Sequence, residues 1–223
     1  MKIKHRGQYQ YAFLDSGSGG LPYLAQLRDK VPFASCVYLA DTLRFPYGEK
    51  TREQVIQFAI EATEKILENF KPEIIVIACN TISVVALEAL RERFLIPFVG
   101  TVPAIKLAAE HSKNRKIGLL ATNLTVADPY TETLISSFAS DCEIVRRGDP
   151  LLVSRIENGL ITAGKHERMK AIQPAVDAFK AAGVDTIVLA CTHFLNVTEE
   201  IQEMAGSSIT VIDSKNGVVQ QAL

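Results

Sequence analysis

Residues 73–81 read Glu-Ile-Ile-Val-Ile-Ala-Cys-Asn-Thr, and residues 185–193 read Asp-Thr-Ile-Val-Leu-Ala-Cys-Thr-His. Each stretch is a short apolar run rich in β-branched residues, which is typical of a strand buried on both faces of a parallel sheet. Both runs end on a cysteine, Cys79 or Cys191, followed by polar residues and a helical pattern. The two stretches therefore predict two similar strand-to-helix units.

The same alternation of strand-like and helix-like segments continues along the chain and predicts an α/β fold with parallel sheets. The predicted strands span 9–14, 36–40, 73–79, 96–100, 116–121, 142–146, 184–190 and 209–212. The clearest predicted helices span 51–70, 82–94, 166–182 and 194–205. Thr51 and Gln54 form a capping-box pair at the start of the first helix, and Gly183 is placed to end the third.

A second matched pair supports two similar halves. Ala-Phe-Leu-Asp15-Ser and Gly-Leu-Leu-Ala-Thr122 both place a small polar residue at the end of an apolar strand, at nearly the spacing that separates the two cysteines. The alternative is that any two buried parallel strands look alike, because both favour Val, Ile, Leu and Ala. We favour a duplication.

Composition narrows the class of protein. The 223 residues are 48% apolar and 22% charged with a net charge of −1, which excludes collagenous and disordered classes and argues against a nucleic-acid partner. No apolar run approaches the roughly 18 residues needed to cross a membrane. Only Tyr11 to Leu14 follows the basic amino terminus as an apolar stretch, too short for a signal peptide, so we expect a cytoplasmic protein.

The four cysteines, at positions 36, 79, 142 and 191, lack C-x-x-C spacing and are predicted to be free thiols. Ligands of open parallel sheets bind beyond the carboxyl ends of the strands, where Cys79 and Cys191 are predicted to lie. Asn80, Thr81 and Ser83 would cap the helix after Cys79. A helix amino terminus favours thiolate, so we expect both thiols to be activated. The alternative is that each cysteine only fills a strand end, the role we assign to Cys36 and Cys142.

Three other motifs could carry chemistry. The loop Asp15-Ser16-Gly17-Ser18-Gly19-Gly20 could present amides to an anion, but it matches neither phosphate-loop pattern, so no nucleotide is expected. Asp15 could be an acid/base group, hold an ammonium group or cap the next helix. His193 could transfer a proton or be structural, and Tyr47, in the turn Pro46-Tyr47-Gly48, could pack or cover a pocket. No metal site is predicted, since His193 lacks partners at ligand spacing.

These motifs together resemble the glutamate racemase family of cofactor-independent aspartate/glutamate racemases. The resemblance rests on Asp15-Ser16-Gly17 with Gly19-Gly20, Pro46-Tyr47-Gly48, Cys79-Asn80-Thr81 and Cys191-Thr192-His193, in that order over nearly the whole chain. It implies two α/β domains related by an approximate twofold axis, with the active site between them. The first would span 1–100, with 208–223 returning to it, and the second 101–207.

The resemblance also implies a mechanism without cofactor or metal. Racemisation removes a proton from one face of Cα and delivers another to the opposite face, which suits two acid/base groups. Cys79 as thiolate would take the proton from D-glutamate while Cys191 returns one, assisted by Asp15 and His193 respectively. Seven residues would hold the substrate: Ser16, Tyr47, Gly48, Asn80, Thr81, Thr122 and Thr192. The family further implies a cytoplasmic homodimer that supplies D-glutamate for peptidoglycan, and hence for cell-wall biogenesis and cell shape.

Three rival functions remain. The chain could be a racemase of the same superfamily acting on aspartate or a hydantoin, although His193 after Cys-Thr favours glutamate, because aspartate-type members more often carry a carboxylate there. It could be a two-lobed binding protein for a small acidic ligand. A cysteine hydrolase is disfavoured, since no G-x-C-x-G elbow surrounds either thiol. One departure from the family is His193-Phe194-Leu195-Asn196, where His-Tyr-Pro-Leu is usual.

Overall fold

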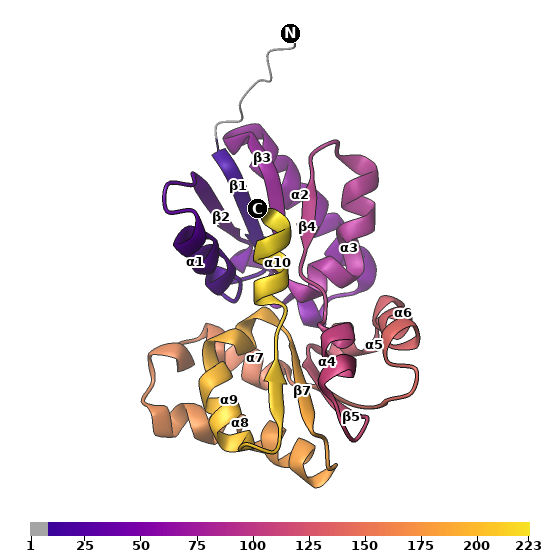
Figure 1. The fold of residues 1–223 in the computed structure, drawn as a ribbon. Helices are drawn as coiled ribbons and strands as arrows, with labels where there is room; N and C mark the ends of the chain where they lie inside the picture. The colour runs from indigo at the N-terminus through magenta and orange to yellow at the C-terminus, as the bar shows by residue number, and fades with distance from the viewer. Residues whose placement is uncertain (1–8) are drawn as a thin grey trace.

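The computed structural model of the protein describes residues 9–223 and places them in two lobes, one above the other (Figure 1). The expectation about a signal peptide concerns the amino terminus and falls largely outside these residues. Each lobe is built on a parallel four-stranded sheet, as the sequence predicts. The strands are β1 (Tyr9–Asp15), β2 (Cys36–Ala40), β3 (Pro72–Ile77), β4 (Phe98–Gly100), β5 (Lys116–Ala121), β6 (Glu143–Gly148), β7 (Thr186–Ala190) and β8 (Thr210–Ile212).

The two sheets have the same strand order. The first runs β2-β1-β3-β4 and the second β6-β5-β7-β8, with every neighbouring pair parallel. Asp15 therefore ends β1 and Thr122 follows β5, the matching strand of the second sheet. Cys79 and Cys191 likewise follow the matching strands β3 and β7. Both matched pairs of the sequence fall at equivalent positions, which supports two similar halves.

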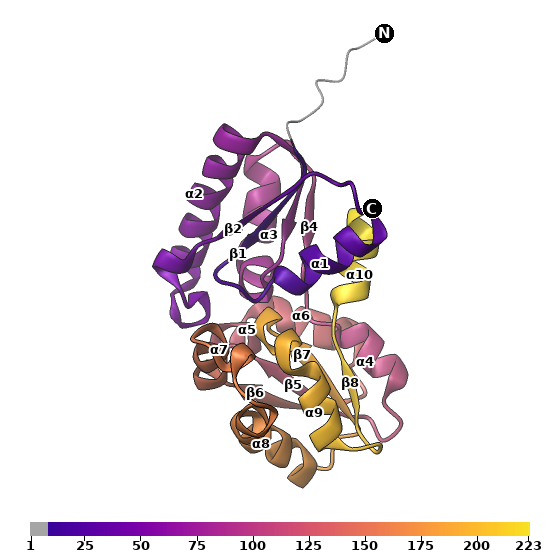
Figure 2. The ribbon, with the colours of Figure 1, turned by 90° about the vertical axis from the view of Figure 1, so that its left-hand side faces the viewer.

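Helices cover both faces of each sheet, as Figures 1 and 2 show from two sides. They are α1 (Leu21–Lys30), α2 (Arg52–Phe70), α3 (Asn80–Arg93), α4 (Ile105–His111), α5 (Asn123–Ala127), α6 (Pro129–Phe138), α7 (Pro150–Glu157), α8 (Lys165–Ala181), α9 (Thr198–Ala205) and α10 (Lys215–Ala222). Alternate residues of β1 point to opposite faces: Ala12 and Leu14 pack against α2 and α3, and Phe13 packs against α1 and α10.

Local signals set several helix ends. The Thr51 side chain accepts from the Gln54 amide while the Gln54 side chain accepts from the Thr51 amide, so the predicted capping box starts α2. The predicted helix 166–182 is α8, and Gly183 follows it with φ of +71°, a conformation that favours glycine.

Two predicted boundaries at the cysteines differ from the structure. The helix expected over 82–94 begins at Asn80, which places Asn80, Thr81 and Ser83 in its first turn rather than at its cap. The helix expected over 194–205 begins as a 3₁₀ helix, Thr192–Val197, and becomes α-helical only at Thr198. Phe194 lies fully buried in the core of the second lobe, and this anchors the 3₁₀ segment.

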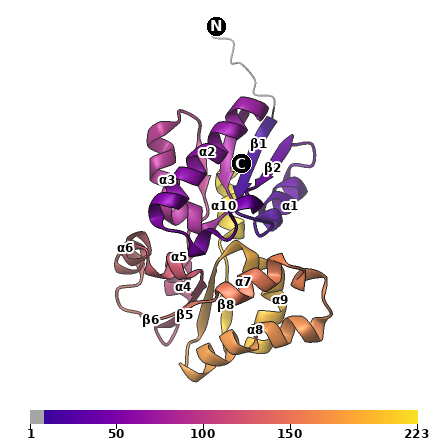
Figure 3. The same ribbon diagram turned by 180° about the vertical axis from the view of Figure 1, so that it is seen from behind.

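The carboxyl-terminal segment crosses from the second lobe to the first (Figure 1). Strand β8 still pairs with β7 in the second sheet, so the return begins after Ile212 and not at residue 208. Helix α10 then packs on the first sheet through Val218, Val219 and Ala222. Two chain crossings, after β4 and after β8, therefore join the lobes, and Figure 3 shows the two lobes from behind.

Candidate active site

Cys79 and Cys191 line one enclosed cavity between the two lobes, although they belong to different sheets. The cavity has a volume of about 10 Å³, which is about the space of one water molecule. Ten predicted site residues line it: Ser16, Tyr47, Gly48, Cys79, Asn80, Thr81, Thr122, Cys191, Thr192 and His193. Phe45, Pro46 and Val153 complete the lining. The remaining predicted residue, Asp15, lies fully buried directly behind this wall.

On the first side of the cavity, Ser16 connects Cys79 to Asp15. The Ser16 hydroxyl lies 3.9 Å from Cys79 Sγ and donates to Asp15 Oδ1 at 3.2 Å. Thr192, from the opposite lobe, donates to Asp15 Oδ2 at 3.1 Å. Asp15 does not cap α1, because the cap position is Gly20 and has no side-chain hydrogen bond. Asp15 thus faces the site, which removes the capping alternative.

The expected activation of Cys79 by the start of α3 is wrong in direction. Burial and the neighbouring Asp15 carboxyl raise the pKa of the Cys79 thiol well above its ordinary value. The backbone amide of Ile82 lowers that pKa, as expected for a helix amino terminus, but it is outweighed. Burial also raises the pKa of Asp15 itself. These surroundings therefore favour the neutral thiol at Cys79.

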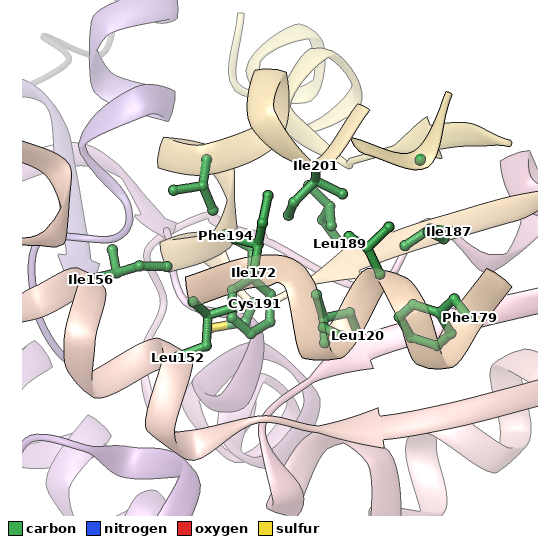
Figure 4. Packing of buried hydrophobic residues seen from close by; sticks show 14 of the residues in the cluster. Leu120, Leu152, Ile156, Ile172, Phe179, Ile187, Leu189, Cys191, Phe194 and Ile201 are labelled. Carbon is green, nitrogen blue, oxygen red and sulfur yellow. The ribbon is translucent and has the colours of Figure 1, made fainter. Parts of the chain in front are cut away.

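On the second side, Cys191 lies directly before the 3₁₀ segment and has a histidine beside it. Its Sγ lies 3.8 Å from His193 Nδ1, and its side chain packs against the core of the second lobe near Leu152 and Phe194 (Figure 4). The segment that begins after Cys191 is a 3₁₀ helix rather than the expected α-helix. The two thiols consequently have different neighbours, a serine and an aspartate on one side and a histidine on the other.

Glu157 completes this second side. Its Oε2 lies 2.9 Å from His193 Nε2, and it ends helix α7. Burial lowers the pKa of His193, but hydrogen bonds to Cys191 and Glu157 raise it to about 10. The hydrogen bond from His193, together with those from Ser18, lowers the pKa of Glu157 to about 2. The pair is thus an imidazolium and a carboxylate at neutral pH.

Sequence reasoning missed Glu157. It stands at the end of an amphipathic helix, before Asn158-Gly159, where a glutamate is ordinarily a solvated surface residue. Only the packing of α7 beside the 3₁₀ segment brings it to His193. No motif in the sequence marks that contact.

Glycines allow the two lobes to approach closely at the site. A Cβ on Gly19 would lie 2.5 Å from His193 Nδ1, and one on Gly48 would lie 2.4 Å from Cβ of Thr122. A Cβ on Gly17 would lie 2.9 Å from the Glu157 carboxylate. The loop expected to present amides to an anion does so, but the anion is this carboxylate of the protein's own second lobe.

Polar groups without partners point to a ligand. Both amide atoms of Asn80 are buried and lack a hydrogen-bond partner among residues 9–223. An unpaired buried polar group costs about 1–3 kcal/mol, so these atoms are candidates for hydrogen bonds to a polar ligand. Beside Asn80, the hydroxyls of Thr81 and Thr122 lie 3.1 Å apart across the lobes, and both also contact the hydroxyl of Thr125.

Tyr47 combines the two roles considered for it. Its side chain is 1% exposed and its ring packs on Phe58, with centroids 5.8 Å apart. Its hydroxyl donates to Asp41 at 2.6 Å, and Asp41 also pairs with Arg44 at 3.1 Å. Tyr47 is therefore a fixed part of the cavity wall.

Other features of the described residues do not compete with this site. No group of three or more His, Cys, Asp or Glu side chains in residues 9–223 could hold a metal ion. Over the same stretch, no helix has the length and apolar run to cross a bilayer. Larger hollows, of about 580, 510 and 420 Å³, lie elsewhere on the described residues, and these three are not lined by a cysteine or a histidine. Cys36 and Cys142 are half-buried and outside the cavity.

Comparison with known proteins agrees with this architecture. A glutamate racemase of Treponema pallidum (strain Nichols) is 48% identical over 218 residues, covering 98% of this chain and 81% of that protein. A glutamate racemase of Glaesserella parasuis serovar 5 (strain SH0165) is 41% identical over 210 residues, covering 94% and 78%. The crystal structure of Escherichia coli glutamate racemase in complex with L-glutamate and the activator UDP-MurNAc-Ala superposes with a TM-score of 0.84 at 33% identity, covering 96% and 80%.

More distant structures share the fold alone. An aspartate racemase homologue from Pyrococcus horikoshii OT3 superposes with a TM-score of 0.60 at 19% identity. The sequence profile of the Asp/Glu/Hydantoin racemase family matches residues 23–222, which is most of the chain. The two sheets of equal topology, the paired strand-end thiols and this match agree, and the chain belongs to the Asp/Glu/hydantoin racemase family.

Proposed function

We propose that this protein is a glutamate racemase that interconverts L- and D-glutamate by proton transfer between Cα and two thiols. The observation that carries the proposal is that two buried cysteines, from matching strands of two sheets, line one cavity. The identity of 48% to a glutamate racemase over nearly the whole chain supports glutamate as the substrate. Orphaned Asn80 and the facing hydroxyls of Thr81 and Thr122 provide groups for a polar substrate.

The chemistry explains the need for two thiols. One fixed base on one face of Cα can remove and return a proton only on that face, whereas inversion needs a donor on the other face. We assign removal of the proton of D-glutamate to Cys79 and donation on the opposite face to Cys191, with the roles reversed for L-glutamate. Asp15, acting through Ser16, would assist Cys79, and His193 would assist Cys191.

The neutral resting state of Cys79 gives the substrate a part in activation. A substrate ammonium group would bring a positive charge into a buried site that holds Asp15 and two thiols. An opposite charge within a few ångströms favours the ionised form of an acid, so the ammonium group would lower the pKa of Cys79. The two substrate carboxylates act in the opposite direction, and the hydrogen-bond donors of the site must offset their charge. The proposal thus links thiolate formation to substrate binding.

The carbanion formed at Cα needs stabilisation. Amide and hydroxyl donors on the α-carboxylate are the natural source, and each donor of this kind contributes about 3–4 kcal/mol in other enzymes. We place Asn80, Thr81, Thr122 and Thr192 around the substrate carboxylates, with Ser16, Tyr47 and Gly48 completing the wall. Exclusion of water by the closed lobes strengthens these hydrogen bonds.

Substrate entry requires the lobes to separate. The cavity has room for about one water molecule, and glutamate is several times larger, so it cannot enter this closed form. The division that we propose has one domain over residues 1–100 and another that begins at 101 and includes β8, with the carboxyl-terminal helix α10 returning to the first. Opening would occur at the two crossings between them.

The biological setting is part of the proposal. We place the protein in the cytoplasm as a homodimer that supplies D-glutamate for peptidoglycan. The family resemblance supports the cytoplasmic location, the homodimer and the supply of D-glutamate. Sedimentation equilibrium of the purified protein tests the dimer.

Exchange of the α-hydrogen tests the function. Purified protein is incubated with L- or D-glutamate in deuterated water without pyridoxal phosphate, and Cα deuterium is followed by NMR and optical rotation by polarimetry. We expect deuterium at Cα and loss of rotation from either enantiomer. Cys79→Ser and Cys191→Ser should each lower racemisation by about 10²–10⁴-fold, the usual contribution of an acid/base group.

Controls separate the rival functions. Cys142→Ser, at a half-buried cysteine outside the cavity, should keep the full rate. The same assay with aspartate tests the related racemase, since faster exchange of aspartate would reassign the substrate. Binding of glutamate without exchange would identify a binding protein and refute the proposed reaction.

A further inference from the structure

Ser18 makes the closest polar contact between the first lobe and the His193 pair. Its hydroxyl donates to Glu157 Oε2 at 2.7 Å, and its backbone amide donates to Oε2 at 3.0 Å and to Oε1 at 3.2 Å. Ser18 belongs to the loop between β1 and α1, whereas Glu157 ends α7 in the second lobe. These three hydrogen bonds therefore exist only when the lobes are closed.

The acceptor of Ser18 is the same atom that orients His193. Oε2 of Glu157 receives the Ser18 hydroxyl and also lies 2.9 Å from His193 Nε2. The other ring nitrogen, Nδ1, lies 3.8 Å from Cys191 Sγ. A continuous chain of contacts thus runs from the first lobe through Ser18, Glu157 and His193 to Cys191.

Ser18 does not line the cavity. The wall includes Ser16 from the same loop but neither Ser18 nor Glu157. Removal of the Ser18 hydroxyl therefore leaves the groups proposed to hold substrate in place. The glycines on either side allow the loop to reach this position, because a Cβ at Gly17 or Gly19 would overlap Glu157 or His193.

We propose that Ser18 is a positioning residue that couples closure of the lobes to proton transfer at Cys191. When the lobes close on substrate, the Ser18 hydroxyl and amide fix the Glu157 carboxylate, and Glu157 fixes the His193 ring beside the Cys191 sulfur. In the open form Glu157 loses these three hydrogen bonds, and the His193 ring loses its fixed orientation. The inference rests on the proposed racemase function and concerns the Cys191 side of the site.

Ser18→Ala tests the proposal, with Ser18→Thr as the variant that retains a hydroxyl. We expect Ser18→Ala to lower kcat about tenfold with little change in KM, since one hydrogen bond to a charged acceptor is lost outside the cavity. Ser18→Thr should recover most of kcat. Ser137→Ala, at an exposed position of α6, is the matched control and should keep the wild-type rate.

Isotope effects distinguish positioning from a general loss of stability. With Cα-deuterated L-glutamate, Cys191 removes the deuteron, so slowing that step in Ser18→Ala should raise the primary isotope effect. With Cα-deuterated D-glutamate, Cys79 removes the deuteron and reprotonation by Cys191 becomes slower, so the primary isotope effect should fall. A structural defect would move both effects in the same direction.

The pH profile gives an independent readout. The charged and titratable groups facing His193 are Glu157 from α7, Asp15 from β1 and Cys191 beside it. Ser18→Ala should shift the alkaline limb of kcat, and the Thr variant should restore it. Equal isotope effects in both directions with an unshifted profile would overturn the positioning role. Absence of exchange in the wild-type protein would instead refute the racemase function, and this inference with it.

Discussion

At the scale of single residues, burial and charge set the protonation of four side chains. Cys79 and Asp15 are buried in a way that raises their pKa values, whereas Glu157 and His193 stabilise each other as an ion pair. The site is therefore asymmetric before substrate arrives. The charged pair lies beside Cys191, whereas burial and Asp15 favour the neutral thiol at Cys79.

The Glu157–His193 pair should make stability depend on pH. The pKa of His193 is raised to about 10, so its contribution is complete below its unfolded value of about 6.5 and is lost as pH rises through 10. The pKa of Glu157 is lowered to about 2, so its contribution is present above its unfolded value of about 4.3 and is lost as pH falls through 2. Asp15 has the opposite effect to Glu157. Because its pKa is raised in the folded state, ionisation of Asp15 lowers the stability of the folded protein as pH rises.

Glu157→Gln should reduce this dependence, because it removes one of the two hydrogen bonds that raise the pKa of His193. We expect a loss of about 2 kcal/mol in the free energy of unfolding at pH 6, less than the 3–5 kcal/mol of fully buried pairs because Glu157 keeps 16% exposure. The loss should shrink by pH 10, where the His193 contribution has already gone. Urea unfolding at the two pH values measures it, and an equal loss at both would contradict the assigned charges.

The sequence was sufficient to single out Cys79 and Cys191 as candidate site residues, but not to predict the protonation of Cys79. Cys79 and Cys191 were recognisable because a polar residue after a buried strand is a local signal. The pKa of Cys79 was not predictable, because it depends on the burial of the thiol and on its distance from Asp15. Glu157 was missed for the same reason, since its partners, Ser18 and His193, lie on other elements.

At the scale of elements, close approach of loops fixes the site. The turn that contains Gly48 presses against Thr122 at the start of α5, and the loop of Gly19 presses against His193. Strand positions were predicted within a few residues because their apolar runs are continuous, and two, 36–40 and 116–121, match to the residue. The 3₁₀ start of the segment after Cys191 was not predicted, because packing of Phe194 in the core determines it.

Gly48→Ala should impair closure without unfolding the protein. The new Cβ would lie 2.4 Å from Thr122 Cβ, so the two lobes must shift apart. Because displacements of about 1 Å reduce rates by about 10²-fold, we expect a loss of that order in kcat/KM.

Gly217→Ala in α10 is the matched control for this test. A Cβ there meets no atom within 4 Å, so activity should be unchanged, and replacing a helical glycine should raise stability by about 0.5–1 kcal/mol. Thermal unfolding and steady-state kinetics of both variants give the comparison. Full activity of Gly48→Ala would show that the lobes need not approach as closely as the structure has them.

At the scale of the whole molecule, two similar lobes enclose the site and are held by a few polar contacts. Besides Ser18–Glu157 and Thr192–Asp15, an ion pair joins Arg52 at the start of α2 to Asp128 at the start of α6. The Asp128 side chain is 2% exposed and the Arg52 side chain 45%. This contact lies away from the cavity and stabilises the closed form.

Arg52→Gln should weaken substrate binding without affecting chemistry. Loss of this half-exposed pair should raise the dissociation constant of glutamate severalfold, about 0.5–1 kcal/mol, with kcat little changed. Isothermal titration calorimetry measures it, and added salt should reduce the difference. Arg93→Gln is the control, since Arg93 pairs with Glu64 within one lobe. Equal effects of the two variants would exclude a role for Arg52 in closure.

The most direct test of the central claim is a crystal structure of the protein with D-glutamate bound in the closed form. Two-base racemisation predicts that Cα lies between the sulfurs of Cys79 and Cys191, about 3.5 Å from each and on opposite faces, with the α-carboxylate on Asn80. A substrate bound with both sulfurs on one side of Cα, or with either sulfur out of reach of it, would contradict the account.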